Sequence, residues 1–151
     1  AVQERQRANL EKYGWVAHFI TDFDSNSPTG SNAHTHGLVE NFNHPDLQVV
    51  LPIPPQVVHS IFVSAIDQIR EGVRFQAGQQ YDKICGGGYK VTFIQATEGD
   101  RAVLRIILPT KNGSLDPLAM DPGEDWQPYR DQFGHKMKIE ERDDGFLPVK
   151  L

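Results

Sequence analysis

Apolar and polar positions recur with different periods along the chain, and these periods predict two helices. The stronger helix signal covers residues 55–71, where apolar side chains return every three or four positions and form one buried stripe. That stripe consists of Val57, Val58, Ile61, Phe62, Ala65, Ile66 and Ile69. Pro55 near its start and Gly72 just past its end are placed as helix boundaries favour. A second, mostly polar helix is predicted over residues 2–13, with Gly14 as its stop.

Strand signals flank the longer helix. Residues 15–23 carry partly apolar side chains at both odd and even positions, which is typical of a strand inside a sheet. Two further runs surround the turn Glu98-Gly99-Asp100 and predict an antiparallel hairpin. Loops are expected at 24–32 and in the Gly-rich stretch 76–88. The predicted strands cover 15–23, 33–39, 47–51, 89–96 and 101–108.

The periodicity weakens after Pro109. Residues 126–133 favour one or two helical turns, and 136–151 form a polar tail that is either disordered or in contact with a partner. The prediction is therefore an α+β fold with a single domain over 1–135. In it, one largely antiparallel sheet packs against one main amphipathic helix, with a short N-terminal helix beside it.

Length and composition narrow the class of protein. A chain of 151 residues is the size of one domain. Its net charge of −5, with scattered Lys and Arg, argues against nucleic-acid binding. No apolar run reaches membrane-spanning length, and the N-terminus lacks the apolar core of a secretory signal. The single cysteine, Cys85, excludes an internal disulfide and fits a reducing compartment. We therefore expect a soluble, cytoplasmic protein.

The segment around His34 and His36 carries metal-ligand chemistry. Residues two apart in a strand share a face, so these imidazoles would point the same way, with Glu40 at the same parity if the strand continues. Together with His44, they form a candidate site for Zn, Fe or Mn, with a position left open for water or substrate. In the alternative interpretation Gly37 breaks the strand, the two histidines line a polar edge, and His44 caps the following turn.

Cys85 is a second candidate for chemistry. It precedes three glycines, 86–88, so its thiol could lie near backbone N–H donors and act as a nucleophile. The alternative is a small packed side chain followed by a tight turn. The triple glycine is not a phosphate-binding loop, because no Lys-Ser or Lys-Thr pair follows it.

Several short motifs occur in a characteristic order. They are Tyr13-Gly14-Trp15, Thr35-His36-Gly37-Leu38, His44-Pro45-Asp46-Leu47 and Pro109-Thr110-Lys111-Asn112-Gly113. Over roughly residues 10–118 this arrangement resembles the bacterial family catalogued as domain of unknown function 4262. The resemblance implies a bacterial origin and a fold, but no reaction. Family members carry an aromatic and an aliphatic residue at the positions of His34 and His36, and Glu at that of Asp46, so the resemblance assigns no role to the histidines.

Three functional hypotheses follow. The first is a binding, accessory or regulatory module without a complete catalytic constellation, acting through a protein partner or as a homodimer that covers an exposed sheet edge. The second is a metal-dependent enzyme or metal sensor built on the histidine segment. The third is a thiol-dependent activity at Cys85. Whether the protein is an enzyme is left open by the sequence.

Overall fold

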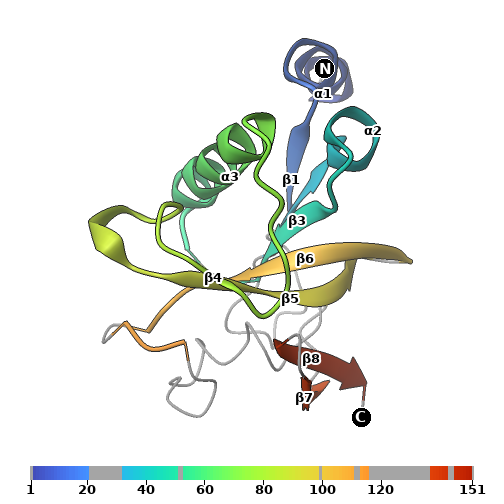
Figure 1. The fold of residues 1–151 in the computed structure, drawn as a ribbon. Helices are drawn as coiled ribbons and strands as arrows, with labels where there is room; N and C mark the ends of the chain where they lie inside the picture. The colour runs from blue at the N-terminus through green and yellow to red at the C-terminus, as the bar shows by residue number, and fades with distance from the viewer. Residues whose placement is uncertain are drawn as a thin grey trace.

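The computed structural model describes residues 2–20, 32–50, 53–98, 100–110, 113–115, 137–142 and 145–150, and Figure 1 shows their arrangement. The helices are α1 (Val2–Tyr13), α2 (Leu38–Phe42) and α3 (Pro55–Arg70), with a 3₁₀ turn η1 (Gly86–Gly88). The strands are β1 (Val16–Ile20), β2 (Asn32–His36), β3 (Asp46–Val49), β4 (Gln80–Tyr81), β5 (Val91–Glu98), β6 (Arg101–Ile107), β7 (Met137–Arg142) and β8 (Gly145–Lys150).

The main sheet has six strands in the order β1-β2-β3-β6-β5-β4. Neighbouring strands are antiparallel except at the centre, where β3 and β6 run parallel. Each half of the sheet is therefore built from strands close in sequence, and the two halves meet at the parallel pair. The prediction of an α+β fold with a largely antiparallel sheet is confirmed, and the one parallel pair makes the sheet mixed.

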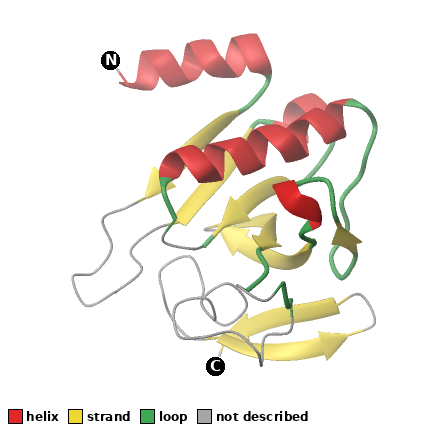
Figure 2. Cartoon of the chain, turned by 90° about the vertical axis from the view of Figure 1, so that its left-hand side faces the viewer, coloured by secondary structure: helices red, strands yellow, loops and turns green. Residues whose placement is uncertain are grey.

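Helix α3 covers one face of this sheet (Figure 2). Its predicted apolar stripe is buried at Val58, Ile61, Phe62, Ala65, Ile66 and Ile69, whereas Val57 is exposed. The sheet side of the same core includes Leu47, Val49, Phe93, Leu104 and Ile106. The odd positions of β3 and β5 and the even positions of β6 thus face α3, as the strand period requires. The other face of the sheet carries the alternate positions.

The chain leaves β2 earlier than predicted. The strand expected over 33–39 ends at His36, and α2 begins at Leu38. Gly37 makes this change of direction with φ +107°, and a Cβ there would lie 2.5 Å from the carbonyl oxygen of Gly14. Glycine is therefore required by both the dihedral angle and the close approach of the α1–β1 turn. The five-residue α2 was too short for a periodicity signal.

Two other segments differ from the sequence prediction. The Gly-rich loop over 76–88 contains the short strand β4 and η1. Within the predicted polar tail over 136–151, β7 and β8 pair as an antiparallel hairpin, and β8 lies beside β5 (Figure 1). The predicted helical turns at 126–133 and the loop at 24–31 lie outside the described residues, and the domain division at 135 stays a prediction. Among the described helices, none combines the length and apolar character needed to cross a membrane.

Candidate metal centre

Three histidines meet where β1 pairs with β2. His18 of β1 lies directly opposite His34 of β2, and His36 follows two residues along the same strand. Cross-strand partners and residues two apart share a face, so all three imidazoles project from the side of the sheet opposite α3. One ring nitrogen from each lies within 4.8 Å of the others, and the His18 and His36 ring centroids are 4.4 Å apart. Neighbouring strands thus supply one compact cluster.

His34 is the most deeply placed of the three, with only 2% of its surface exposed. Its Nε2 lies 3.5 Å from Oε1 of Glu98, at the end of β5. Its Nδ1 is buried and has no hydrogen-bond partner among the described residues. Because a buried polar atom without a partner costs about 1–3 kcal/mol, such an atom calls for an explanation. A bound metal ion would satisfy it.

A charged network holds Glu98 in place. Arg101 Nε donates to Glu98 Oε2 at 3.0 Å, and its Nη1 donates to Asp46 Oδ2 at 2.8 Å. Its Nη2 donates to the carbonyl oxygen of Thr35 at 3.0 Å. The almost fully buried Asp46 accepts further bonds from Thr35 Oγ1 and from the Leu38 N–H, at the start of α2. Strand β2, which carries His34 and His36, is therefore tied to β3, β5 and β6 through one guanidinium.

Burial keeps the deeper histidines neutral. Desolvation lowers the pKa of His34 to about 4, with His36, His18 and Arg101 adding to the effect and Glu98 opposing it. Desolvation, followed by Arg101, also lowers the pKa of His36. For Glu98, burial acts to raise the pKa, but the hydrogen bond from Arg101 and the nearby charges outweigh it and the pKa is lowered. Near pH 7, His34 is a neutral imidazole, the form that ligates metals, beside an ionised carboxylate.

The structure brings together two of the four predicted ligands. His34 and His36 belong to the cluster, whereas Glu40 lies exposed on α2. The parity argument for Glu40 was wrong because the strand ends before it. His44 lies elsewhere: its Nδ1 donates to the Pro45 carbonyl at 2.8 Å, and its Nε2 accepts the N–H of Phe75 at 3.1 Å. With both nitrogens occupied, His44 fastens the turn to the segment after α3.

Three residues of the site were missed by sequence reasoning, namely His18, Glu98 and Arg101. The alternation in residues 15–23 placed His18 on one face of its strand, but nothing in the sequence set the register between β1 and β2. Glu98 was predicted in the hairpin turn, and Arg101 as the first residue of the strand after it. They reach the cluster because β6 pairs with β3, a pairing across a long separation in sequence. Knowledge that β3 pairs with β6 would have been needed to predict that Glu98 and Arg101 reach the histidines.

Cys85 has the properties of a packed side chain. It is half-buried against the hydrophobic core, and burial raises the pKa of its thiol. A raised pKa reduces the thiolate fraction near neutral pH and thus the nucleophilicity of the residue. The geometry does not support a thiol-dependent reaction.

The cluster has the donor set of an open transition-metal site. Imidazole nitrogens suit Zn, Fe, Ni and Cu, and three protein ligands leave a coordination position for water or a small molecule. In a tetrahedral zinc site the ligand nitrogens are about 3.3 Å apart, given Zn–N bonds of about 2.05 Å. The nitrogens of the cluster, within 4.8 Å of one another, need only modest side-chain rotation to reach that spacing. Glu98 behind His34 Nε2 resembles the carboxylate that commonly orients a metal-bound histidine.

Comparison with known proteins gives one match. Residues 9–115 match the family described as domain of unknown function 4262, so the chain belongs to this family. This confirms the family resemblance inferred from the motifs. No curated protein and no solved structure matches the chain.

Proposed function

We propose that the protein binds a divalent transition metal through His18, His34 and His36. Zn²⁺ fits the all-nitrogen donor set well. Three protein ligands with an open position distinguish such a centre from a structural zinc site, which is closed by four. The proposed function is therefore a metal-dependent enzyme or metal sensor, in which the open position takes water or a small ligand.

One observation carries this proposal: in a cluster of three imidazoles, the buried Nδ1 of His34 lacks a partner within the part of the chain that the structure describes. A structural histidine in this protein looks different, since His44 uses both ring nitrogens in hydrogen bonds. Imidazoles that merely pack together gain no benefit from leaving a nitrogen unsatisfied. A metal ion explains the unsatisfied nitrogen and the convergence of the rings together.

The surrounding charges also favour a cation. Asp46 and Glu98 contribute two negative charges and Arg101 one positive charge, which leaves a net charge of −1 beside three imidazoles. The Glu98 carboxylate touches the His34 ring directly, so a positive charge on that ring or on a metal bound to it is stabilised. The net negative charge favours a dication, and His34 does not have to lose a proton before it binds one, because it is already neutral near pH 7.

The test measures Zn²⁺ and Co²⁺ binding by calorimetry on chelator-treated protein, with visible Co²⁺ absorption as a second readout. We expect one ion per chain and a loss of affinity of at least tenfold in His18→Gln and in His36→Gln, both half-buried positions where folding should survive. Glu40→Gln is the matched control and should bind like the unchanged protein.

Two results would contradict the proposal. One is the absence of saturable binding to correctly folded protein. The other is metal binding that Glu40→Gln removes and His18→Gln leaves intact, because the ligands would then differ from the cluster. The first result would favour the alternative of a binding or accessory module that acts through a partner, and the second would assign the metal to other ligands.

A further inference from the structure

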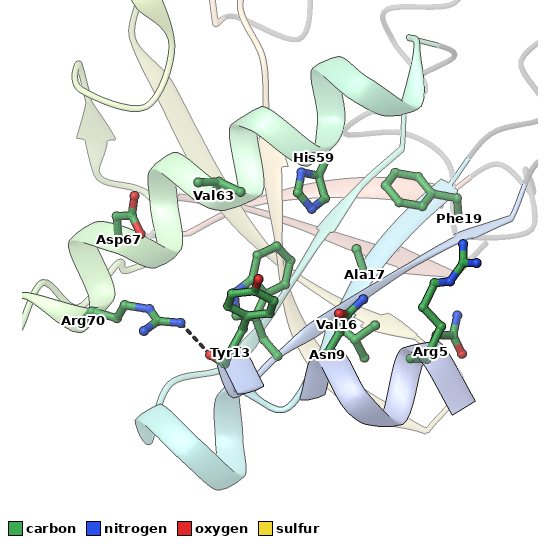
Figure 3. A pocket seen from close by; sticks show the side chains of 12 residues that line it. Arg5, Asn9, Tyr13, Val16, Ala17, Phe19, His59, Val63, Asp67 and Arg70 are labelled. Carbon is green, nitrogen blue, oxygen red and sulfur yellow. Dashed lines mark hydrogen bonds between the residues drawn. The ribbon is translucent and has the colours of Figure 1, made fainter. Parts of the chain in front are cut away.

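A groove of about 890 Å³ lies between α1 and α3, along β1 (Figure 3). Its floor is β1, an edge strand of the main sheet. The volume is that of a pocket for a small organic ligand, for which about 300–1,000 Å³ is usual. None of the histidines of the metal cluster lines it. The groove is therefore a second site, independent of the proposed function.

The two walls of the groove differ in chemistry. The sheet and α3 side is apolar and aromatic, with Trp15, Phe19 and Val63, and the Trp15 ring stacks on His59 at a centroid distance of 5.6 Å. The α1 side carries polar side chains, since Arg5, Gln6 and Asn9 line the groove there. A helix usually turns its apolar stripe toward the protein. Here α1 presents hydrogen-bond donors to an aromatic wall and leaves the space between them open.

The two arginines of the groove differ in their contacts with the rest of the protein. At one end Arg70 donates to the carbonyl oxygen of Tyr13 and lies over the Phe42 ring, with Asp67 close by on the same helix. At the other end, Arg5 extends toward Phe19 (Figure 3) and forms no ion pair within the described part of the chain. An anion is therefore favoured at the Arg5 end and disfavoured beside Asp67.

We propose that this groove binds an aromatic acid, an apolar molecule of two or three aromatic rings with one anionic group. The rings lie against Trp15 and Val63, where aromatic stacking and burial of apolar area favour them. The acidic group lies at the Arg5 end and accepts hydrogen bonds from the guanidinium and from the neighbouring side-chain amides. The aromatic wall thus binds the rings of the ligand, and the polar α1 side binds its acidic group.

The test uses two dyes that differ in a single group. 1-Anilinonaphthalene-8-sulfonate carries an anion, and N-phenyl-1-naphthylamine has the same rings without it. Titration followed by dye fluorescence should give saturable binding of both, with the anionic dye tighter. Arg5→Gln should weaken the anionic dye about fivefold, as expected for an exposed ion pair, and leave the neutral dye unchanged.

Steric variants test the location. Val63→Phe should abolish binding of both dyes, and Ala17→Leu fills the groove from the strand side as a second variant if the first folds poorly. Val57→Phe is the control, since Val57 is exposed on the same helix but does not line the groove. Non-saturable binding, or binding untouched by both filling variants, overturns the proposal. Equal loss of both dyes in Arg5→Gln overturns recognition of the acid.

A second copy of the chain is the competing occupant, because β1 is an edge strand. The molar mass of the protein, measured by size-exclusion chromatography with light scattering in the presence and absence of the anionic dye, distinguishes a small ligand from a second copy. A monomer in both conditions supports the proposal, and a dimer that dissociates when the dye binds overturns it.

Discussion

Replacing Arg101 by methionine is the sharpest test of the network beneath the metal cluster. The substitution keeps an unbranched apolar stem and removes the guanidinium that joins Asp46, Glu98 and the Thr35 carbonyl. Asp46 is 1% exposed and Arg101 33% exposed, so the loss leaves a buried carboxylate without its counter-charge.

The magnitude follows from this geometry. Breaking a fully buried ion pair by removing one partner costs about 3–5 kcal/mol. The partial exposure of Arg101 screens the pair, and Asp46 keeps its hydrogen bonds from Thr35 and Leu38, so both effects reduce the cost. We expect Arg101→Met to lower the free energy of unfolding by about 2 kcal/mol.

Urea unfolding of a double-mutant cycle measures the coupling. In an Asp46→Asn background the same arginine substitution should cost less than about 1 kcal/mol, because the buried charge is already absent. Arg74→Met is the control: Arg74 is exposed and donates to the carbonyls of Ile69 and Val73. Its loss should cost about 0.5 kcal/mol or less. Equal costs of Arg101→Met in both backgrounds would refute the assigned role of the pair.

Three further predictions concern the fold. Burial lowers the pKa of His44, so the unfolded chain takes up a proton first; stability is full above about pH 6.5 and falls as the pH drops toward the folded pKa. His34 and His36, whose pKa values are also lowered, add to this pH dependence. His44→Asn should reduce it in urea titrations, and an unchanged slope would exclude a contribution from His44. Gly37→Ala should cost about 2–3 kcal/mol by thermal unfolding, clearly more than Gly72→Ala, because both have positive φ but only Gly37 is crowded. Phe62→Ala should lower the unfolding free energy by about 3–5 kcal/mol, and a loss below 1 kcal/mol would contradict its place in the core.

Local pattern was sufficient for the elements that depend on local physics. The apolar stripe of α3, its proline and glycine boundaries and the hairpin of β5 and β6 were all predicted close to their observed limits. These features rest on side-chain period and turn chemistry within a few residues. The small helix α2 was missed because its start depends on Gly37 approaching the backbone at Gly14, a contact between distant turns.

The candidate site needed information that is not local. Histidines two apart pointed to His34 and His36, but completing the cluster required the register that places His18 opposite His34. The carboxylate came from Glu98, on a strand far along the chain, rather than from the nearby Glu40. The parity of Glu40 assumed an uninterrupted strand, and no propensity argument predicted that Asp46 would stabilise the start of a helix there.

The parallel junction of β3 and β6 has a consequence for how the chain assembles. Each three-strand half is a meander of local pairings, whereas the junction joins Gln48 to Arg105 across most of the domain. Closing a loop of about 57 residues costs roughly 3.6 kcal/mol in chain entropy, beyond a constant term. The buried Arg105 guanidinium must also lose water before its Nε donates to the Gln48 side-chain oxygen Oε1 at 2.7 Å. We therefore expect docking of the two halves to be the slow step of folding. During synthesis on the ribosome, we expect the N-terminal half with its histidines to form before β6 pairs with β3 and brings the Glu98 carboxylate to them.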